Sequence, residues 1–150
     1  MTQNHYRHLL VMAALSFASM YVLMYAMVDT PDNVFANFNQ IYMAGLMTAP
    51  MIIIELLVMR SMYHNHARNM VIVGTSAAVG IAFFMFIREQ TVISDRQFLR
   101  SMIPHHAGAI LMCERASIQD REIKRLCSTI IVGQQAEIDQ MRAKLRQLED

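Results

Sequence analysis

The sequence has few charged residues, and the charges that it has almost cancel. Lys, Arg, Asp and Glu make up 17% of its 150 residues, with 13 basic and 12 acidic side chains. Soluble domains carry roughly a quarter of such residues, so this shortage is not typical of a soluble protein. The net charge of +1 supplies no basic field for nucleic acid, and we expect no nucleic-acid partner.

Cysteine is also scarce, and one enzyme motif is missing. The chain has only Cys113 and Cys127, which are too few for a disulfide framework but enough for one bridge. No Glu-x-x-His motif occurs, whereas ferritin-like dimetal oxidases need that motif together with Glu from several helices. A ferritin-like metal oxidase is therefore the less favoured hypothesis, and we expect that the protein is not an enzyme.

Apolar residues are abundant, at 55% of the chain, and they gather in three long runs. The runs cover residues 9–28, 41–59 and 70–87, and each can cross a hydrocarbon core of about 30 Å as a helix. The first run is longer than the apolar part of a signal peptide and ends at a poor cleavage site, so we expect it to be retained. The sequence thus predicts a transmembrane anchor over 1–90, embedded in the lipid bilayer, and a separate domain over 91–150.

The positive charges in the short loops predict the orientation of these spans. Arg7 precedes the first run, and Arg60 and Arg68 lie between the second and third, whereas the loop over 29–40 has only acidic charges. Because Lys and Arg are enriched in cytoplasmic loops, we expect a cytoplasmic N-terminus. In a bacterial inner membrane, the segment from 91 onward would then lie in the periplasm.

One ionisable side chain, Glu55, falls inside the second run. An acidic group within a membrane span is costly and marks a functional site by default. The alternative is that Glu55 reaches the interface or Arg60. Rows of Met in the first two runs are interpreted as helix packing in preference to a thioether path for metal.

The segment after the third run predicts two helices. Ser94 and Gln97 have the spacing of a capping box, which would start a helix over 95–117, with Pro104 bending it or opening its first turns. A second helix is expected over 121–147, where apolar residues recur at helical spacing. The predicted fold class is therefore all-α, with three transmembrane helices followed by an extramembrane αα-hairpin. A hairpin of this size buries little core, so we expect a homodimer that completes a four-helix bundle.

Side chains that bind soft metals gather on the first of these two helices. At about 100° per residue, all five fall within a sector of about 120°. The five are Met102, His105, His106, Met112 and Cys113. Thioether, thiolate and imidazole donors suit Cu(I) or Ag(I), and Zn is an option if Cys dominates.

The second helix brings further candidates to this sector. An antiparallel hairpin is expected to set Met102 near Glu137, with Met141 a turn further on as a ligand from across the hairpin. Glu137 either holds a His ring in position or belongs to a solvated face. Cys113 and Cys127 could take part in metal binding, form a disulfide in an oxidising compartment, or only pack.

Several motifs resemble the signature of the family catalogued as domain of unknown function 305. They are Met-Ile-Pro-His-His at 102–106, Ala-Ile-Leu-Met at 109–112 and Gln-Ala-Glu-Ile-Asp-Gln-Met at 135–141. The stretches at 20–27 and 42–51 are similar to the membrane-anchored branch of that family.

The resemblance implies a ferritin-like fold and binding of copper or silver in the periplasm. It carries over the ligand roles of Met102, His105, His106, Met112 and Met141, whereas Cys113 and Cys127 are not part of the family pattern. We therefore expect a membrane-tethered protein that captures Cu(I) or Ag(I) for resistance, buffering or handover to a metal exporter or chaperone. The alternative is a structural protein whose hairpin docks a partner, or dimerises, without metal.

Overall fold

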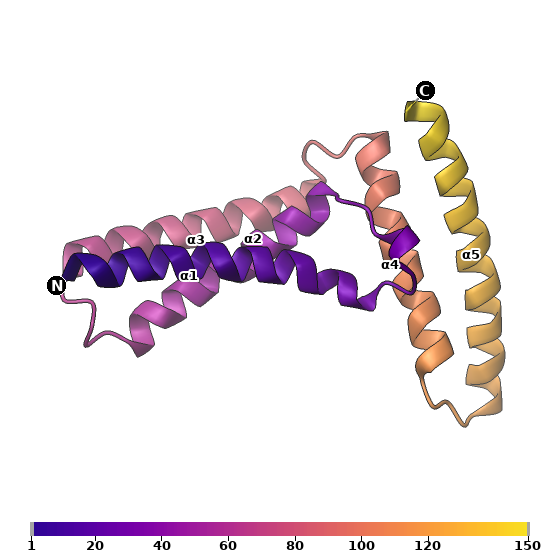
Figure 1. Ribbon diagram of the computed structural model, residues 1–150, viewed down its shortest axis with the longest axis horizontal. Coiled ribbons are helices and arrows are strands. Elements are labelled where there is room, and N and C mark those ends of the chain that lie inside the picture. Colours follow the sequence, from indigo (N-terminus) through magenta and orange to yellow (C-terminus); the bar gives the residue numbers. More distant parts are fainter. Residues whose placement is uncertain (1, 150) are drawn as a thin grey trace. The chain divides into compact units, whose positions relative to one another are not determined.

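The computed structural model describes residues 2–149, and these residues form helices and no strand (Figure 1). The predicted all-helical fold class is confirmed. There are five α-helices and two short 3-10 helices: α1 (Thr2–Leu23), η1 (Met24–Met27), η2 (Pro31–Asn33), α2 (Phe38–Val58), α3 (His66–Glu89), α4 (Asp95–Arg115) and α5 (Arg121–Glu149).

The chain divides into two compact units. The first contains the residues up to Leu23 together with Asn39–Val92, and the second contains Met24–Phe38 together with the residues from Ile93 onward. The loop Met24–Phe38, which lies within the predicted anchor, is thus part of the same unit as α4 and α5.

Among the described residues, three helices are long and apolar enough to cross a membrane. They span Asn4–Met27, Phe38–Val58 and His66–Glu89, and contain nearly all of the three predicted runs. Many of their large apolar side chains are exposed, including Leu10 and Leu15 on α1, as is expected of side chains that face lipid.

Small residues allow α2 and α3 to approach closely in the first unit. A Cβ atom at Gly45 would collide with the ring of Phe83, and one at Gly80 would lie 3.1 Å from the Cβ atom of Ala49. Such contacts between small residues are typical of helices that pack within a bilayer. Pro50 lies within α2 and does not end it.

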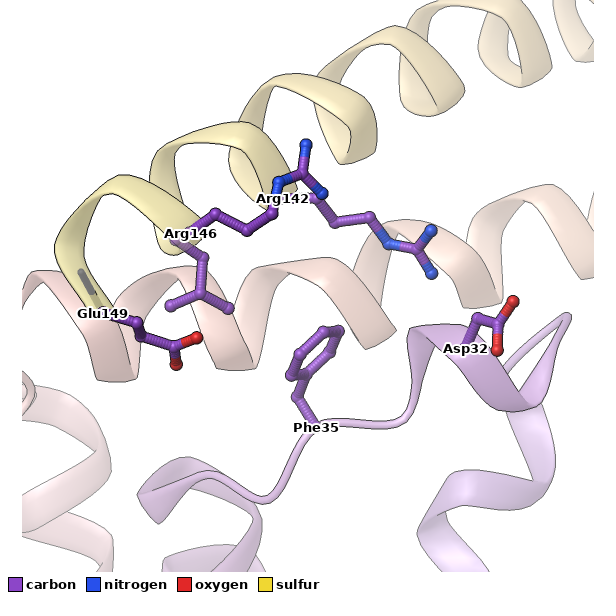
Figure 2. Close-up of a pocket in the computed structure, with 6 residues that line it drawn as sticks. Asp32, Phe35, Arg142, Arg146 and Glu149 are labelled. Atoms are coloured by element: carbon purple, nitrogen blue, oxygen red, sulfur yellow. The ribbon is translucent and has the colours of Figure 1, made fainter.

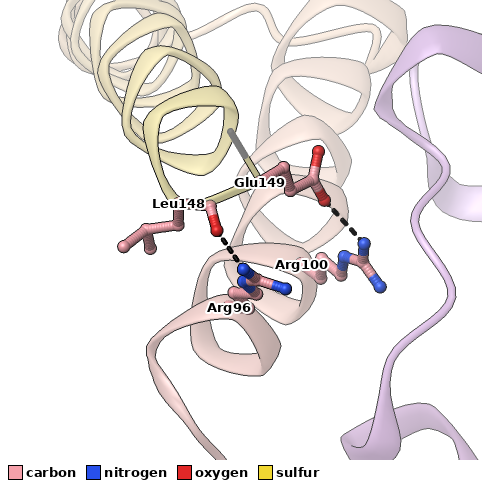
Figure 3. A network of polar contacts seen from close by, with 4 residues as sticks. All are labelled: Arg96, Arg100, Leu148 and Glu149. Carbon is pink, nitrogen blue, oxygen red and sulfur yellow. Dashed lines mark hydrogen bonds and ion pairs between the residues drawn. The ribbon is translucent and has the colours of Figure 1, made fainter.

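In the second unit, α4 and α5 lie side by side and run in opposite directions (Figure 1). Their shared core consists of buried apolar side chains: Ile103, Ala107, Ile110, Ile138 and Leu145. At one end Arg96 donates to the backbone oxygen of Leu148, and Arg100 pairs with Glu149 at 2.6 Å (Figure 3). At the other end the Cys113–Cys127 disulfide joins the two helices.

The start of α4 differs from the predicted capping box. Ser94 takes the N-cap position, but its side chain makes no capping hydrogen bond. The amide oxygen of Gln97 accepts a hydrogen bond from the backbone N–H of Phe38 at 3.0 Å. The capping box is therefore wrong, because Gln97 is recruited by the loop that precedes α2.

Two further details of α4 differ from expectation. Pro104 is buried within α4, which remains helical from Asp95 to Arg115, so proline does not open its first turns. The helix ends two residues before the predicted 117.

The first turn of α5 is capped by Asp120, whose Oδ1 accepts hydrogen bonds from the backbone N–H groups of Glu122 and Ile123.

The loop Met24–Phe38 packs against α4. Val28 and Phe35 contact the core that α4 shares with α5, and a Cβ at Gly108 would lie 3.3 Å from the backbone oxygen of Met27. Within the loop, the hydroxyl of Tyr25 donates to the backbone oxygen of Phe35 at 2.8 Å. These contacts make the loop a structural part of the second unit.

Candidate metal site

His106 lies between α4 and α5 in an environment that differs from that of its neighbour. Its side chain is 14% exposed, and its Nε2 atom lies 3.5 Å from Oε2 of Glu137 on α5. Its Nδ1 atom is buried and has no hydrogen-bond partner among the described residues. A buried imidazole nitrogen without a partner needs an explanation, and binding of an ion is one of the ordinary ones.

The surroundings of His106 favour the neutral imidazole. Burial lowers the pKa of His106 below its usual value, the neighbouring His105 lowers it further, and the carboxylate of Glu137 opposes the shift. In the neutral ring one nitrogen carries the proton and the other keeps a lone pair. A carboxylate beside Nε2 favours the proton at Nε2, which leaves the lone pair at the buried Nδ1.

The register of the two helices differs from the predicted one. Glu137 contacts His106, whereas the sequence places Glu137 near Met102. One helical turn from His106 along α4 is Met102, and one turn from Glu137 along α5 is Met141. Because the helices run in opposite directions, Met102 and Met141 lie at the same level. Both are half-buried, and Met141 packs against the shared core.

The structure separates the other two predicted ligands of α4 from this level. His105 is exposed, and its ring centroid lies 6.1 Å from that of His106 with the ring planes at 68°. The Met112 side chain is 53% exposed. His105 and Met112 thus form an outer edge of α4, while Met102 and His106 lie on the side nearer α5.

The two cysteines form a disulfide, with 5.2 Å between their Cα atoms. The sequence left the role of Cys113 and Cys127 open, and in the structure they are joined in a disulfide. Neither Cys113 nor Cys127 offers a free thiolate to a metal while the bridge is intact.

Side chains of His, Cys, Asp and Glu do not gather into a metal site in the part of the chain that the structure describes. No group of three or more His, Cys, Asp or Glu side chains is placed to hold an ion there. A site at His106 would therefore depend on thioether donors, which Cu(I) and Ag(I) accept readily.

Glu55 belongs to a different cluster, in the first unit. It interacts with the phenol of Tyr63, which is buried in a cluster with Leu9 and Leu56. Burial raises the pKa of Tyr63, and the negative charge of Glu55 raises it further. Glu55 thus has a polar partner from the loop between α2 and α3, and the side chains of Met12 and Met62 pack against the same cluster.

Sequence reasoning missed a pocket in the second unit (Figure 2). It has a volume of about 310 Å³ and is lined by Asp32, Phe35, Arg142, Leu145, Arg146 and Glu149. The sequence signal for it is Phe35, an aromatic residue that follows the polar stretch 29–33. That signal does not indicate where the loop packs.

The fold and these contacts define an all-helical protein with three helices able to span a membrane and a second, disulfide-bridged helical unit. Residues 86–145 match the model of a family described as domain of unknown function (DUF305). The chain is 31% identical over 140 residues to the uncharacterized protein L153 of Acanthamoeba polyphaga mimivirus. This match covers 91% of the chain and 90% of that protein. The chain belongs to the DUF305 family. No solved structure matches it.

Proposed function

We propose that this protein is tethered in a bacterial inner membrane and captures Cu(I) or Ag(I) in the periplasm. His106 would bind the metal through Nδ1, and Met102 and Met141 would supply thioethers from the same level of α4 and α5. Capture of this kind serves metal resistance, buffering or handover to an exporter or chaperone. The protein binds metal and performs no catalysis in this proposal.

The observation that carries the proposal is the environment of His106. Its Nδ1 is buried without a partner, and its Nε2 lies 3.5 Å from the Glu137 carboxylate. Metal-binding His residues commonly direct their second ring nitrogen to a carboxylate, which fixes the tautomer and strengthens the ligand. The half-buried Met102 and Met141 would complete a site with two sulfur donors and one nitrogen donor.

The donor chemistry favours monovalent soft ions over Zn. Zn prefers thiolate, imidazole and carboxylate ligands, and both cysteines are joined in a disulfide. Thioethers bind Cu(I) and Ag(I) well and bind Zn poorly.

Three observations support a periplasmic position for α4 and α5. Disulfides persist in oxidising compartments and are rare in the cytosol. The loop Met24–Phe38 also packs in one unit with α4 and α5, as is required if three spans bring both segments to the same side. Arg7, Arg60 and Arg68 favour a cytoplasmic side for the segments that carry them. The acidic loop before α2, and with it α4 and α5, would then lie on the outer side.

The test is a Cu(I) titration of the full chain in detergent, in competition with a chromophoric Cu(I) chelator. Replacing the inner donors together, as M102L/H106Q/M141L, should abolish tight binding while the helical content is retained. The matched control is H105Q/M112L, which removes the same donor types from the exposed edge of α4 and should bind nearly as wild type. Unchanged affinity in the inner variant would refute the proposed site, and loss in the control alone would move it to the outer edge.

A second candidate function is protein interaction through the α4–α5 surface. Met112, Ile123 and Leu126 are 53%, 49% and 58% exposed, and exposed apolar side chains mark interaction sites where they form a continuous patch. A second copy of the chain would cover them in a four-helix bundle. Mass measurement by light scattering in metal-free detergent tests this: a dimer that the substitution I123E/L126E dissociates would support the interaction function.

A further inference from the structure

The pocket between the loop and α5 contains two arginines whose charges are not neutralised. Arg142 and Arg146 form no ion pair with any described residue, and the buried Nε of Arg142 lacks a hydrogen-bond partner. Glu149 lies at the same pocket, but its carboxylate is already paired with Arg100 at 2.6 Å (Figure 3). Asp32 is therefore the one acidic group of the lining that remains to oppose two guanidinium groups.

The side chains that line the pocket suit an anionic ligand. Arg142 and Arg146 lie one turn apart on α5, so both side chains reach the same side of the helix. Figure 2 shows the side chain of Arg142 extending toward Asp32, with the ring of Phe35 below the helix. Planar guanidinium groups bind phosphate oxygens in pairs of parallel hydrogen bonds, which makes arginine pairs frequent phosphate ligands.

We propose that this pocket binds a phosphate group, and that the source is the headgroup of an anionic phospholipid. The apolar side chains of Phe35 and Leu145 beside the arginines suit a ligand with an apolar part next to its phosphate. The loop that carries Asp32 and Phe35 continues at both ends into helices able to span a membrane. Free phosphate shares the same chemistry and is the other source to be distinguished.

The experiment uses the full chain in an uncharged detergent with two probes, phosphatidylglycerol and inorganic phosphate. Retained lipid is counted by native mass spectrometry, and both probes are titrated against the unfolding temperature. The pocket variant is R142Q/R146Q. The matched control is R121Q/R125Q, which removes the same charge from exposed positions on the same helix.

Saturable binding of one phosphatidylglycerol should be weakened about tenfold for each pocket arginine removed, because hydrogen bonds to charged groups are strong. The control should bind as wild type. The substitution D32N should act in the opposite direction and tighten binding, since it removes the opposing carboxylate. A variant that misfolds cannot produce this gain.

Two results would overturn the proposal. One is equal binding of both probes by the pocket variant and the control variant. The other is an equal loss in both variants, which would indicate attraction to net charge alone. Binding of inorganic phosphate without phosphatidylglycerol, with the same dependence on Arg142 and Arg146, would support the phosphate site and assign the free anion as its source.

Discussion

The chemistry of His106 depends on one side chain from the neighbouring helix. Glu137 lies beside Nε2 and favours the tautomer that leaves Nδ1 free. The substitution E137Q keeps the shape of the side chain and removes the charge. We expect Cu(I) affinity to fall by about 10- to 100-fold, as is usual when the partner of a metal-binding His is lost.

The control for E137Q is D139N, two residues along α5. Asp139 is exposed and accepts a hydrogen bond from Gln135 at 3.0 Å, so its replacement should leave Cu(I) affinity unchanged. Competition titration measures both variants. Wild-type affinity in E137Q would show that Glu137 is only part of a solvated face.

The lowered pKa of His106 predicts how the metal-free protein responds to acid. The unfolded chain takes up a proton near the ordinary His value of about 6.5, whereas the folded chain takes it up only at lower pH. The stability from neutral His106 is therefore complete above about pH 6.5 and is lost as pH falls toward the folded pKa. The drop in unfolding temperature between pH 7 and pH 5 should be smaller in H106Q than in wild type. H105Q should keep most of the drop, because burial is the larger cause of the lowered pKa of His106 and His105 is a smaller one.

At the scale of single residues, the sequence identifies the candidate metal donors of α4 but not how the structure groups them. Angular spacing put Met102, His105, His106, Met112 and Cys113 in one sector, and the observed surroundings divide that sector into an inner and an outer edge. The division depends on the register of α4 against α5. Register is set by packing between Ile103, Ala107 and Ile138, which no local pattern records.

At the scale of elements, the Cys113–Cys127 bridge closes one end of the α4–α5 pair. The two residues are 14 positions apart in sequence, and a loop of this length corresponds to about 3 kcal/mol of stabilisation. In C113S/C127S we expect hydrogen exchange to speed up in α4 and α5 and to stay unchanged in α2 and α3. Cu(I) stoichiometry should also stay unchanged, because the bridged sulfurs are not ligands; a lower stoichiometry would return the cysteines to the site.

The helices themselves could be predicted closely from the sequence. Long apolar runs and helical spacing located all five, with ends that differ from the observed ones by at most seven residues. The capping box failed for a tertiary reason, since the amide of Gln97 binds the backbone of Phe38. A local motif cannot report a partner that is distant in sequence.

At the scale of the whole molecule, the orientation in the membrane can be tested by labelling with a membrane-impermeant maleimide. In a C113S/C127S background, A36C reports the loop before α2, S117C the end of α4, and S61C the loop before α3. All three positions are exposed. Intact cells should be labelled at A36C and S117C, and at S61C only after permeabilisation. Labels on opposite sides at A36C and S117C would contradict three spans, and the reverse pattern would contradict the orientation.

The sequence did not predict that the loop Met24–Phe38 belongs to the same unit as α4 and α5. A polar, acidic loop with one proline is typical of a solvent-exposed connection. Here its apolar residues Val28 and Phe35 pack against the core of α4 and α5. Only the tertiary structure shows that a loop between two helices able to span a membrane supplies part of another unit.

This discontinuity imposes an order on biosynthesis. The loop Met24–Phe38 leaves the ribosome early, but the helices against which it packs are made last, after α2 and α3. The second unit therefore cannot finish folding until α5 has been synthesised. The surroundings of His106 between α4 and α5 form only in chains whose α1, α2 and α3 have already been synthesised, so a chain interrupted before α5 would lack the proposed metal site.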